Sequence, residues 1–400
     1  MAEFYDGPHA TPAPAAEGPI YLGIKNMTED GHLDLSEIRH IAESEFLIWT
    51  RRVEPRTGDL IFTYEASLHR YAIIPKDFRG TLGRRVALIR PRADIVDTRF
   101  LLYLFISPQW RDTVQQRVNV GSTVDRLPLT EFPAFPLRVP PLTTQHKIAA
   151  ILSAYDDLIE NNNRRIKLLE EMAQRIYREW FVDFRYPGHE SVALVDSELG
   201  PLPEGWEVQP FAALGEYMNG YAFKPDDWGS DGLPIIKIRE LKNGVTDETP
   251  RYSGDLGPKY EIADGDLLFS WSADLDAYLW TGGPAWLNQH LFRVDPSHGL
   301  RQAFLFHALR ERMVDFRSRA QGTTMRHIKR AALSQVSCVV PPEVQRNRFE
   351  EVVAPVDRLA LSVVRATRNL RAARDLLLPR LISGEIDVTD LGIAMGVAAA

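Results

Sequence analysis

The chain has 400 residues, of which 44% are hydrophobic and 25% are charged. These globular proportions exclude a disordered chain, and the length favours two or three domains over a single core. A single cysteine, Cys338, excludes disulfides within the chain and a cysteine-based zinc site. The net charge of −7 argues mildly against a nucleic-acid partner, so such a partner would need a local concentration of positive charge.

Membrane and export signals are missing from the sequence. No apolar run approaches the roughly 18 residues that a membrane span needs. Residues 1–18 contain neither the basic region nor the apolar region of a secretory signal. We therefore expect a cytoplasmic protein.

The first half of the chain predicts a mixed fold. Residues 1–17 contain three prolines and five alanines, and we expect a flexible tail there. A helix is predicted over 98–118, and a proline-rich boundary follows at 128–141. Short runs rich in Ile, Leu, Val and Phe predict strands over 20–24, 59–63 and 85–89.

The second half predicts the same kinds of element in the same order. A proline-rich linker region covers 187–210, and a helix is predicted over 302–320. Strand-like runs occur at 233–238, 266–270 and 291–294.

Each half ends in a long region of heptad-spaced apolar residues, 148–180 and 349–377. Pro355 is acceptable only in the first turn of a helix, and Pro379 is expected to end one. We therefore expect a short helix and then a long one in each half, the long ones starting near residues 155 and 355.

The two halves repeat each other, with an offset that drifts between 201 and 214 residues. Sparse identities keep their order along both halves, which makes chance matches a poor explanation. The matched pieces are Gly121–Thr123 with Gly322–Thr324, Val139–Pro141 with Val340–Pro342, Gly58–Phe62 with Gly265–Phe269, and Tyr21–Lys25 with Ile235–Arg239.

An amphipathic helix cannot bury its apolar stripe alone, so each of the two heptad-patterned helices needs a partner to pack against. Two copies in one chain favour packing on each other as an antiparallel coiled coil, with the polar Asn162 fixing the register. Two separate bundles are the alternative. The predicted fold class is α+β, with two repeated mixed α/β domains separated by two long helices paired as an antiparallel coiled coil.

Positive charge is concentrated in one segment of each half. Residues 39–92 contain eleven Lys and Arg against six Asp and Glu, and residues 293–330 contain nine against three. Residues 186–235 contain one Lys or Arg against nine Asp and Glu. The negative net charge of the chain therefore does not reveal its two basic segments. Most single arginines lie on solvated faces, but a basic segment in each repeat favours a nucleic-acid partner.

The two matched turns at 121–123 and 322–324 combine glycine with hydroxyl side chains and are followed by basic residues. Glycine permits a close backbone approach, and hydroxyl and main-chain N–H groups suit phosphate oxygens. A turn that ends a helix explains the same residues about as well.

Few catalytic patterns are present. The sequence has no glycine-rich nucleotide loop, no H-E-x-x-H motif and no spaced histidines that predict a metal site. Asp226, Glu240 and Lys242 fit the degenerate pattern of metal-dependent nucleases, which keeps a nuclease as an alternative. Asp59 and Asp266 hold equivalent places in the repeats, and we interpret both as turn-forming residues.

Taken together, these pieces resemble the specificity subunit of type I restriction-modification enzymes. The resemblance covers about residues 18–388. It rests on the paired G-D-L-[IL]-F turns and on WLNQHLFRV (286–294), GTTMRHIKR (322–330), VPPLTTQHKIAAIL (139–152), REWFVDF (178–184) and LLLPRLISGEIDV (376–388).

The resemblance implies two target-recognition domains, each followed by a helical conserved region. The expected order is a tail at 1–17, recognition domain 1 at 18–139, helical region 1 at 140–184, a linker at 185–204, recognition domain 2 at 205–340, helical region 2 at 341–384 and a C-terminal tail at 385–400. One departure concerns the start of recognition domain 1, which has no counterpart of the opening segment 201–220 with its Gly205–Glu207. A truncated or misassigned start would explain this difference.

The resemblance also implies a function without catalysis by this chain. Each recognition domain would read one half of an interrupted, asymmetric double-stranded DNA site, and the paired helices would set the spacing. Two methyltransferase subunits would dock on the helical regions, joined by motor-nuclease subunits where present. S-adenosylmethionine, ATP and Mg²⁺ would be bound only by those partners. A helical scaffold without DNA selectivity is a further alternative.

The candidate DNA-contacting residues lie in the basic segments, the two glycine–hydroxyl turns and the ends of predicted strands. In the first half they are Arg51, Arg52, Arg70, Arg84, Arg85, Ser122, Thr123 and Arg126. In the second half they are Lys237, Arg239, Gln289, His290, Thr323, Thr324, Arg326, His327 and Lys329.

Overall fold

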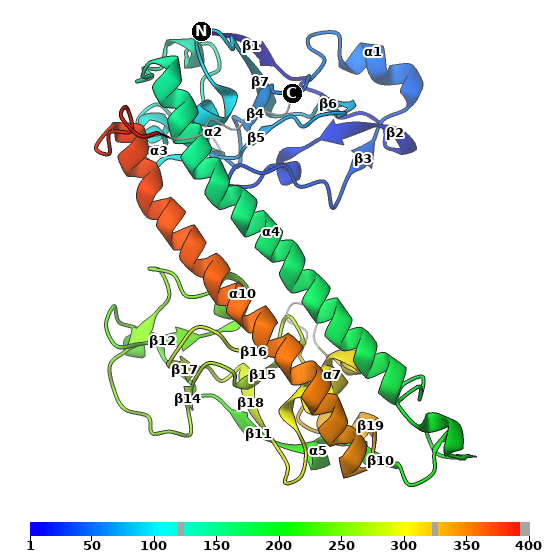
Figure 1. Cartoon of the computed structure of the whole chain (residues 1–400). Coiled ribbons are helices and arrows are strands. Elements are labelled where there is room, and N and C mark those ends of the chain that lie inside the picture. The colour runs from blue at the N-terminus through cyan, green and yellow to red at the C-terminus, as the bar shows by residue number, and fades with distance from the viewer. Residues whose placement is uncertain (119–123, 322–326, 393–400) are drawn as a thin grey trace. The chain divides into compact units, whose positions relative to one another are not determined.

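The computed structural model describes residues 1–118, 124–321 and 327–392. The chain divides into two compact units (Figure 1). Unit 1 comprises residues 1–159 and 369–400, and unit 2 comprises residues 160–368. Two long helices run through both units, so each unit consists of a globular part and a segment of each helix.

Unit 1 contains two small sheets built from β1 to β7. One is antiparallel with the order β1-β7-β4-β5, and the other has the order β3-β2-β6, in which β2 and β6 run parallel. The strands are β1 (Ala2–Asp6), β2 (Ala15–Leu22), β3 (Arg39–His40), β4 (Leu60–Thr63), β5 (Tyr71–Ile73), β6 (Gly80–Leu82) and β7 (Val86–Pro91).

α2 (Thr98–Ile106) is followed directly by α3 (Pro108–Gln115), and both pack on the first of these sheets. The single-turn α1 (Phe46–Trp49) instead contacts β6 of the second sheet. The predicted helix over 98–118 is thus interrupted, because Ser107 caps the second helix and Pro108 opens it. Phe62, Phe100, Phe105 and Trp110 contribute to the buried core.

Unit 2 repeats this plan. Its sheets have the orders β11-β18-β15-β16 and β13-β12-β17-β14, and β12 and β17 again run parallel. The strands are β11 (Gly215–Asn219), β12 (Leu233–Ile236), β13 (Arg251–Tyr252), β14 (Glu261–Ile262), β15 (Leu267–Ser270), β16 (Asp276–Leu279), β17 (Ala285–Leu287) and β18 (Leu291–Pro296). The helices are α6 (Ile238–Asn243), α7 (Gln302–Glu311), α8 (Met313–Ser318) and α9 (Ala332–Gln335).

Unit 2 also has an opening segment. β8 (Leu194–Val195) and β9 (Leu202–Pro203) form a hairpin, and β10 (Glu207–Pro210) pairs with β19 (Ser337–Val340). α5 (Phe211–Leu214) follows, with Phe211 and Leu214 fully buried. Among the described residues of unit 1, no strand pairs with the stretch 137–139 that corresponds to β19.

The flexible tail expected over residues 1–17 is a wrong prediction. Residues 2–6 form β1, which pairs with β7 along its whole length. Phe4 of β1 lies 5.6 Å from Phe132 and 6.1 Å from Phe62, measured between ring centroids. This apolar contact anchors the strand, while the prolines that suggested a tail all lie beyond it.

The long helices are α4 (Leu142–Phe181) and α10 (Glu343–Ser383). Each is continuous, so the predicted division into a short and a long helix is wrong. Pro355 and Pro379 lie inside α10. A proline deprives the carbonyl four residues earlier of its partner, and here those carbonyls belong to the exposed Glu351 and Asp375.

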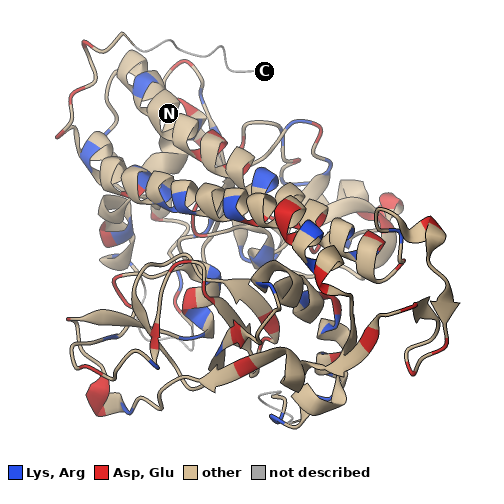
Figure 2. Cartoon of the chain, turned by 60° about the horizontal axis from the view of Figure 1, so that its bottom comes forward, with Lys and Arg blue, Asp and Glu red and all other residues tan. Residues whose placement is uncertain are grey.

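The two helices pack as an antiparallel pair, as predicted. In unit 1, Ile148 and Leu152 near the start of α4 share a buried cluster with Leu378 and Leu381 near the end of α10. In unit 2, Phe181 at the end of α4 lies 4.9 Å from the ring of Phe349 near the start of α10. Both signs of charge occur along these helices (Figure 2).

Candidate nucleic-acid interface

The parallel strand pair of each unit ends in two adjacent loops. In unit 1 these are residues 23–25 after β2 and residues 83–85 after β6. In unit 2 they are residues 237–239 after β12 and residues 288–290 after β17. We call them the paired loops. Because the strands are parallel, both loops emerge at the same edge of the sheet, where α/β folds commonly bind ligands.

The backbones of the paired loops lie close together. In unit 2, the Asn288 N–H donates to the Ile236 carbonyl at 3.1 Å. In unit 1, a Cβ atom at Gly83 would lie 2.2 Å from the Leu22 carbonyl oxygen, so only glycine fits there. The Tyr21 hydroxyl accepts the Arg84 N–H at 2.9 Å and orients this loop further.

A buried polar side chain shapes the first loop of each pair. The Gly23 N–H donates to Asn26 Oδ1 at 2.9 Å, and the Lys237 N–H donates to Glu240 Oε2 at 3.0 Å. Asn26 is 6% exposed and Glu240 is 1% exposed. The repeats therefore share the same local fold, and what differs between them is the side chains that the loops present.

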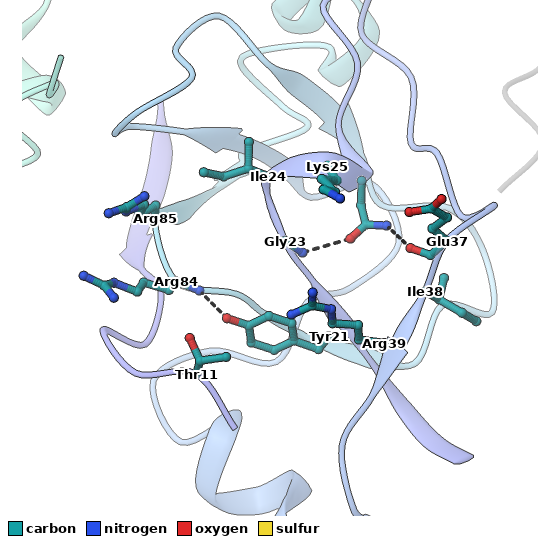
Figure 3. A pocket seen from close by; sticks show the side chains of 11 residues that line it. Thr11, Tyr21, Gly23, Ile24, Lys25, Glu37, Ile38, Arg39, Arg84 and Arg85 are labelled. Carbon is teal, nitrogen blue, oxygen red and sulfur yellow. Dashed lines mark hydrogen bonds between the residues drawn. The ribbon is translucent and has the colours of Figure 1, made fainter. Parts of the chain in front are cut away.

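The paired loops of unit 1 line a cavity of about 460 Å³ with several basic side chains (Figure 3). Lys25, Arg39, Arg84 and Arg85 line it, against one acid, Glu37. Its other lining residues are Thr11, Tyr21, Gly23, Ile24, Asn26 and Ile38.

These cations differ in how they are paired. Lys25, Arg39 and Arg84 are exposed and make no ion pair or side-chain hydrogen bond within the described part of the chain. Arg85, in contrast, pairs with Glu65 at 2.8 Å. The same Glu65 carboxylate lies 3.7 Å from Arg126. The three exposed cations are thus available to a polyanion, whereas Arg85 is held by an internal acid.

A second basic cavity of unit 1, of about 370 Å³, is lined by Arg51, Arg52, His9 and Trp49 among others. Arg52 donates to the Gly7 carbonyl at 2.8 Å and lies 3.4 Å from Asp6. Arg51 is exposed and has no ion pair among the described residues.

The paired loops of unit 2 carry histidine and glutamine at the places of the arginines. Gln289 and His290 follow β17 as Arg84 and Arg85 follow β6. The ring of Trp271 lies 5.6 Å from His290 and 6.5 Å from His327. Burial lowers the pKa of His290, which favours a neutral ring that can both donate and accept hydrogen bonds.

The cations of the other unit 2 loop have partners in the protein. The Lys237 ammonium lies 3.9 Å from the centre of the Trp228 ring, and burial lowers its pKa. Arg239 lies 3.0 Å from Glu240 and 3.5 Å from Glu248. These contacts hold two cations at the loop and leave fewer unpaired charges there than in unit 1.

The structure brings part of the predicted set together. In unit 1, Arg85 and Arg126 both approach Glu65, and Arg84 precedes Arg85 on the same loop. In unit 2, the Trp271 ring lies between His290 and His327, and Gln289 precedes His290 on the same loop. Lys237 and Arg239 lie on the neighbouring loop. Lys329 is exposed on the segment after His327. Ser122, Thr123, Thr323, Thr324 and Arg326 lie outside the described residues.

Other residues lie apart from this arrangement or were missed. Arg70 donates to the Met27 carbonyl at 3.0 Å and lies 3.6 Å from Glu29, which indicates a structural role. Sequence reasoning missed Lys25 and Arg39. A signal for Lys25 existed in the sequence, because the repeat match aligns it with Arg239, which is one of the candidate DNA-contacting residues.

The described residues of these loops offer cations and polar groups to a polyanion, and two of the three nuclease candidates are paired within the protein. Glu240 is buried among Lys237, Arg239 and Thr249, while Lys242 pairs with Asp274 at 2.5 Å. Within the described residues, no group of three His, Cys, Asp or Glu side chains could hold a metal ion. The geometry therefore gives no support to the nuclease alternative. Among these residues, no helix is long and apolar enough to cross a membrane.

Comparison with known proteins supports the repeat and the fold. A family model described as type I restriction modification DNA specificity domain matches residues 45–171 and again 203–349. The type I restriction enzyme MjaIX specificity subunit of Methanocaldococcus jannaschii is 24% identical over 88% of this chain and 83% of its own length. The HindI specificity subunit of Haemophilus influenzae is 23% identical over 83% and 87%, respectively.

A solved structure shows the same fold. The crystal structure of the type I restriction-modification S subunit from M. genitalium aligns over 95% of this chain and 93% of its own, with a TM-score of 0.54 and 13% identity.

Proposed function

This chain belongs to the family of the type I restriction modification DNA specificity domain, and we propose on that basis that it is the DNA-recognition subunit of a type I restriction-modification complex. In this role each unit reads one half of a bipartite, asymmetric site in double-stranded DNA. The subunit performs no chemistry itself and directs the chemistry of its partners.

The observation that carries this proposal is the duplicated pair of loops. Each unit presents polar and cationic side chains from two adjacent loops at one edge of a sheet, on the same local fold. The differences between repeats, arginine in one and glutamine with histidine in the other, suit readers of two different half-sites. Arginine forms paired hydrogen bonds to guanine and glutamine to adenine, and the exposed cations provide phosphate contacts.

The partners and cofactors follow from this role. We propose that two methyltransferase subunits dock on the α4–α10 pair and that motor-nuclease subunits join for restriction. S-adenosylmethionine, ATP and Mg²⁺ then belong to those subunits, and the complex acts in the cytoplasm, where it meets DNA.

Methylation mapping tests the proposal. Genomic DNA is compared from hosts that express the partner methyltransferase with and without this chain. We expect a two-part methylated motif with a fixed gap only when the chain is present. The same methylation without the chain, or no sequence-selective binding by the complex, would support a scaffold role. Mg²⁺-dependent cleavage by the isolated chain would support a nuclease.

A further inference from the structure

Each unit buries a polar cluster where a helix of its globular part, α2 in unit 1 and α7 in unit 2, meets both long helices. In unit 1, the Tyr103 hydroxyl of α2 donates to Asp156 Oδ2 of α4 at 2.5 Å. Arg374 of α10 donates to the other oxygen of the same carboxylate at 2.7 Å. Tyr103 is 4% exposed and the Arg374 side chain 11%. Three separate segments thus converge on one carboxylate.

Unit 2 has the equivalent cluster with different chemistry. His307 of α7 is fully buried, and its Nε2 lies 3.2 Å from both oxygens of Asp357 on α10. Its Nδ1 lies 3.0 Å from Gln174 Oε1 on α4. Asp357 is the residue that matches Asp156 in the repeat, so the two long helices exchange roles between the units.

The orientation of the Gln174 amide is set by its neighbours and decides which of its atoms faces His307. Gln174 Nε2 lies 2.8 Å from Glu311 Oε2 and 3.3 Å from the His307 carbonyl, so the nitrogen must point there and the oxygen toward the ring. Both ring nitrogens of His307 then face acceptor oxygens, so the ring bridges α4 and α10.

We propose that these two clusters are positioning clamps that fix each recognition domain on the helix pair and thereby set how strictly the spacing between half-sites is read. This inference rests on the proposed function. Apolar contacts alone tolerate small rotations, whereas a buried polar group that is hydrogen-bonded to two other segments favours one orientation. In unit 1 this group is the Asp156 carboxylate, and in unit 2 it is the His307 ring. The clamps contact no DNA, so they act on spacing and leave base selectivity to the paired loops.

The experiment uses the complete complex and the mapped site. Binding is measured to duplexes with the native spacer, with one base pair added or removed, and with one half-site base changed. The variants are Tyr103→Phe, which removes one hydroxyl, and His307→Leu. Tyr5→Phe is the matched control, because the Tyr5 hydroxyl also donates to a carboxylate, Glu3, but on the surface.

We expect Tyr103→Phe and His307→Leu to lower discrimination against wrong spacers at least threefold while base selectivity stays the same. Tyr5→Phe should change neither. Asp357→Asn keeps an acceptor oxygen toward the His307 ring and should retain most of the discrimination, and Tyr103→Phe carries the test alone if His307→Leu does not fold. A folded Tyr103→Phe or His307→Leu variant with unchanged spacer discrimination would overturn the clamp. A wild-type complex without any sequence selectivity would contradict the proposed function itself.

Discussion

Arg84 and Arg85 are neighbours in sequence, but the structure gives them different roles. Arg84 is exposed and unpaired among the described residues, while Arg85 pairs with Glu65 and has a positive φ of 72°. Such a φ is uncommon outside glycine and asparagine. Arg84 is thus free to contact DNA, and Arg85 shapes the loop that presents it.

We predict that Arg84→Ala weakens DNA binding by about 1 kcal/mol or more, that is about fivefold or more, with little change in stability. A phosphate contact would show as a slope of log affinity against log salt that is smaller by about one. Arg92→Ala is the control, because Arg92 is exposed and its guanidinium pairs with Asp94 among the described residues. Binding titrations at several salt concentrations measure the effect, and an affinity equal to that of the control would remove Arg84 from the interface.

The only cysteine gives a second prediction at this scale. Cys338 lies in β19, and burial raises the pKa of its thiol to about 12. Because the thiolate is the nucleophile, we expect almost no alkylation by iodoacetamide at pH 8 in the folded protein. Mass spectrometry should show full labelling after unfolding in urea. Rapid labelling of the native protein would mean that β10 and β19 separate readily.

The sequence indicated where basic and polar residues gather, but it did not indicate which of them are paired within the protein. Basic and polar residues beside predicted strands marked parts of the paired loops in both units, although Arg84 and Arg85 correspond to Gln289 and His290. Whether an arginine is free or neutralised depends on acids far away in sequence, such as Glu65 for Arg126 and Glu29 for Arg70. No local pattern reports those pairs.

At the scale of elements, periodicity predicted the long helices but local rules misplaced their ends. Pro355 and Pro379 were expected outside helix interiors, yet the apolar seam of α10 continues through both. Burial of a long stripe outweighs the roughly 3 kcal/mol that an interior proline costs. Arg374 interrupts the heptad pattern because Asp156 neutralises it. That partner could not be identified before the helices were seen to pair.

A cavity in unit 1 holds the place that corresponds to α5 in unit 2. A space of about 240 Å³ in unit 1 is lined by Phe4, Phe105, Trp110 and Phe132 among others. The register of β1 on β7 matches that of β11 on β18, so this cavity lies where α5 precedes β11 in unit 2. There the buried Phe211 lies 5.3 Å from the Phe316 ring.

We predict that a copy of the sequence of residues 202–214, fused in place of Met1, stabilises unit 1. Burial of the copied phenylalanine should add about 1.5–3 kcal/mol to the free energy of unfolding. Calorimetry should show a higher melting temperature for one transition. A control graft with serine at the position copied from Phe211 should lose the gain, and equal melting temperatures for both grafts would show that the cavity is not filled.

At the scale of the whole molecule, the duplication was the most informative feature of the sequence. Matched pieces in the same order predicted two units with the same sheets, and the antiparallel pairing follows because each unit uses the start of one helix and the end of the other. The loops that differ between the repeats could not be predicted in the same way, because the repeat match reports shared residues and these side chains differ between the units.

The helix pair gives the last prediction, which concerns the gap between half-sites. The contacts Asp156–Arg374 and Phe181–Phe349 share one register, which places Asn162 opposite Arg368. Inserting one heptad after each of these two residues preserves the seam and lengthens both helices by about 10 Å. Because one base pair rises about 3.4 Å, we expect the accepted gap to grow by about three base pairs.

Methylation mapping with the double insertion measures this change. An insertion after Asn162 alone breaks the register with α10, and we expect it to change the accepted gap while also lowering stability. Seven residues inserted after Glu198, in the exposed turn between β8 and β9, are the control and should leave the gap unchanged. If the double insertion folds and the native gap persists, the helices do not determine the spacing, and the distance between half-sites must be set by the partner subunits.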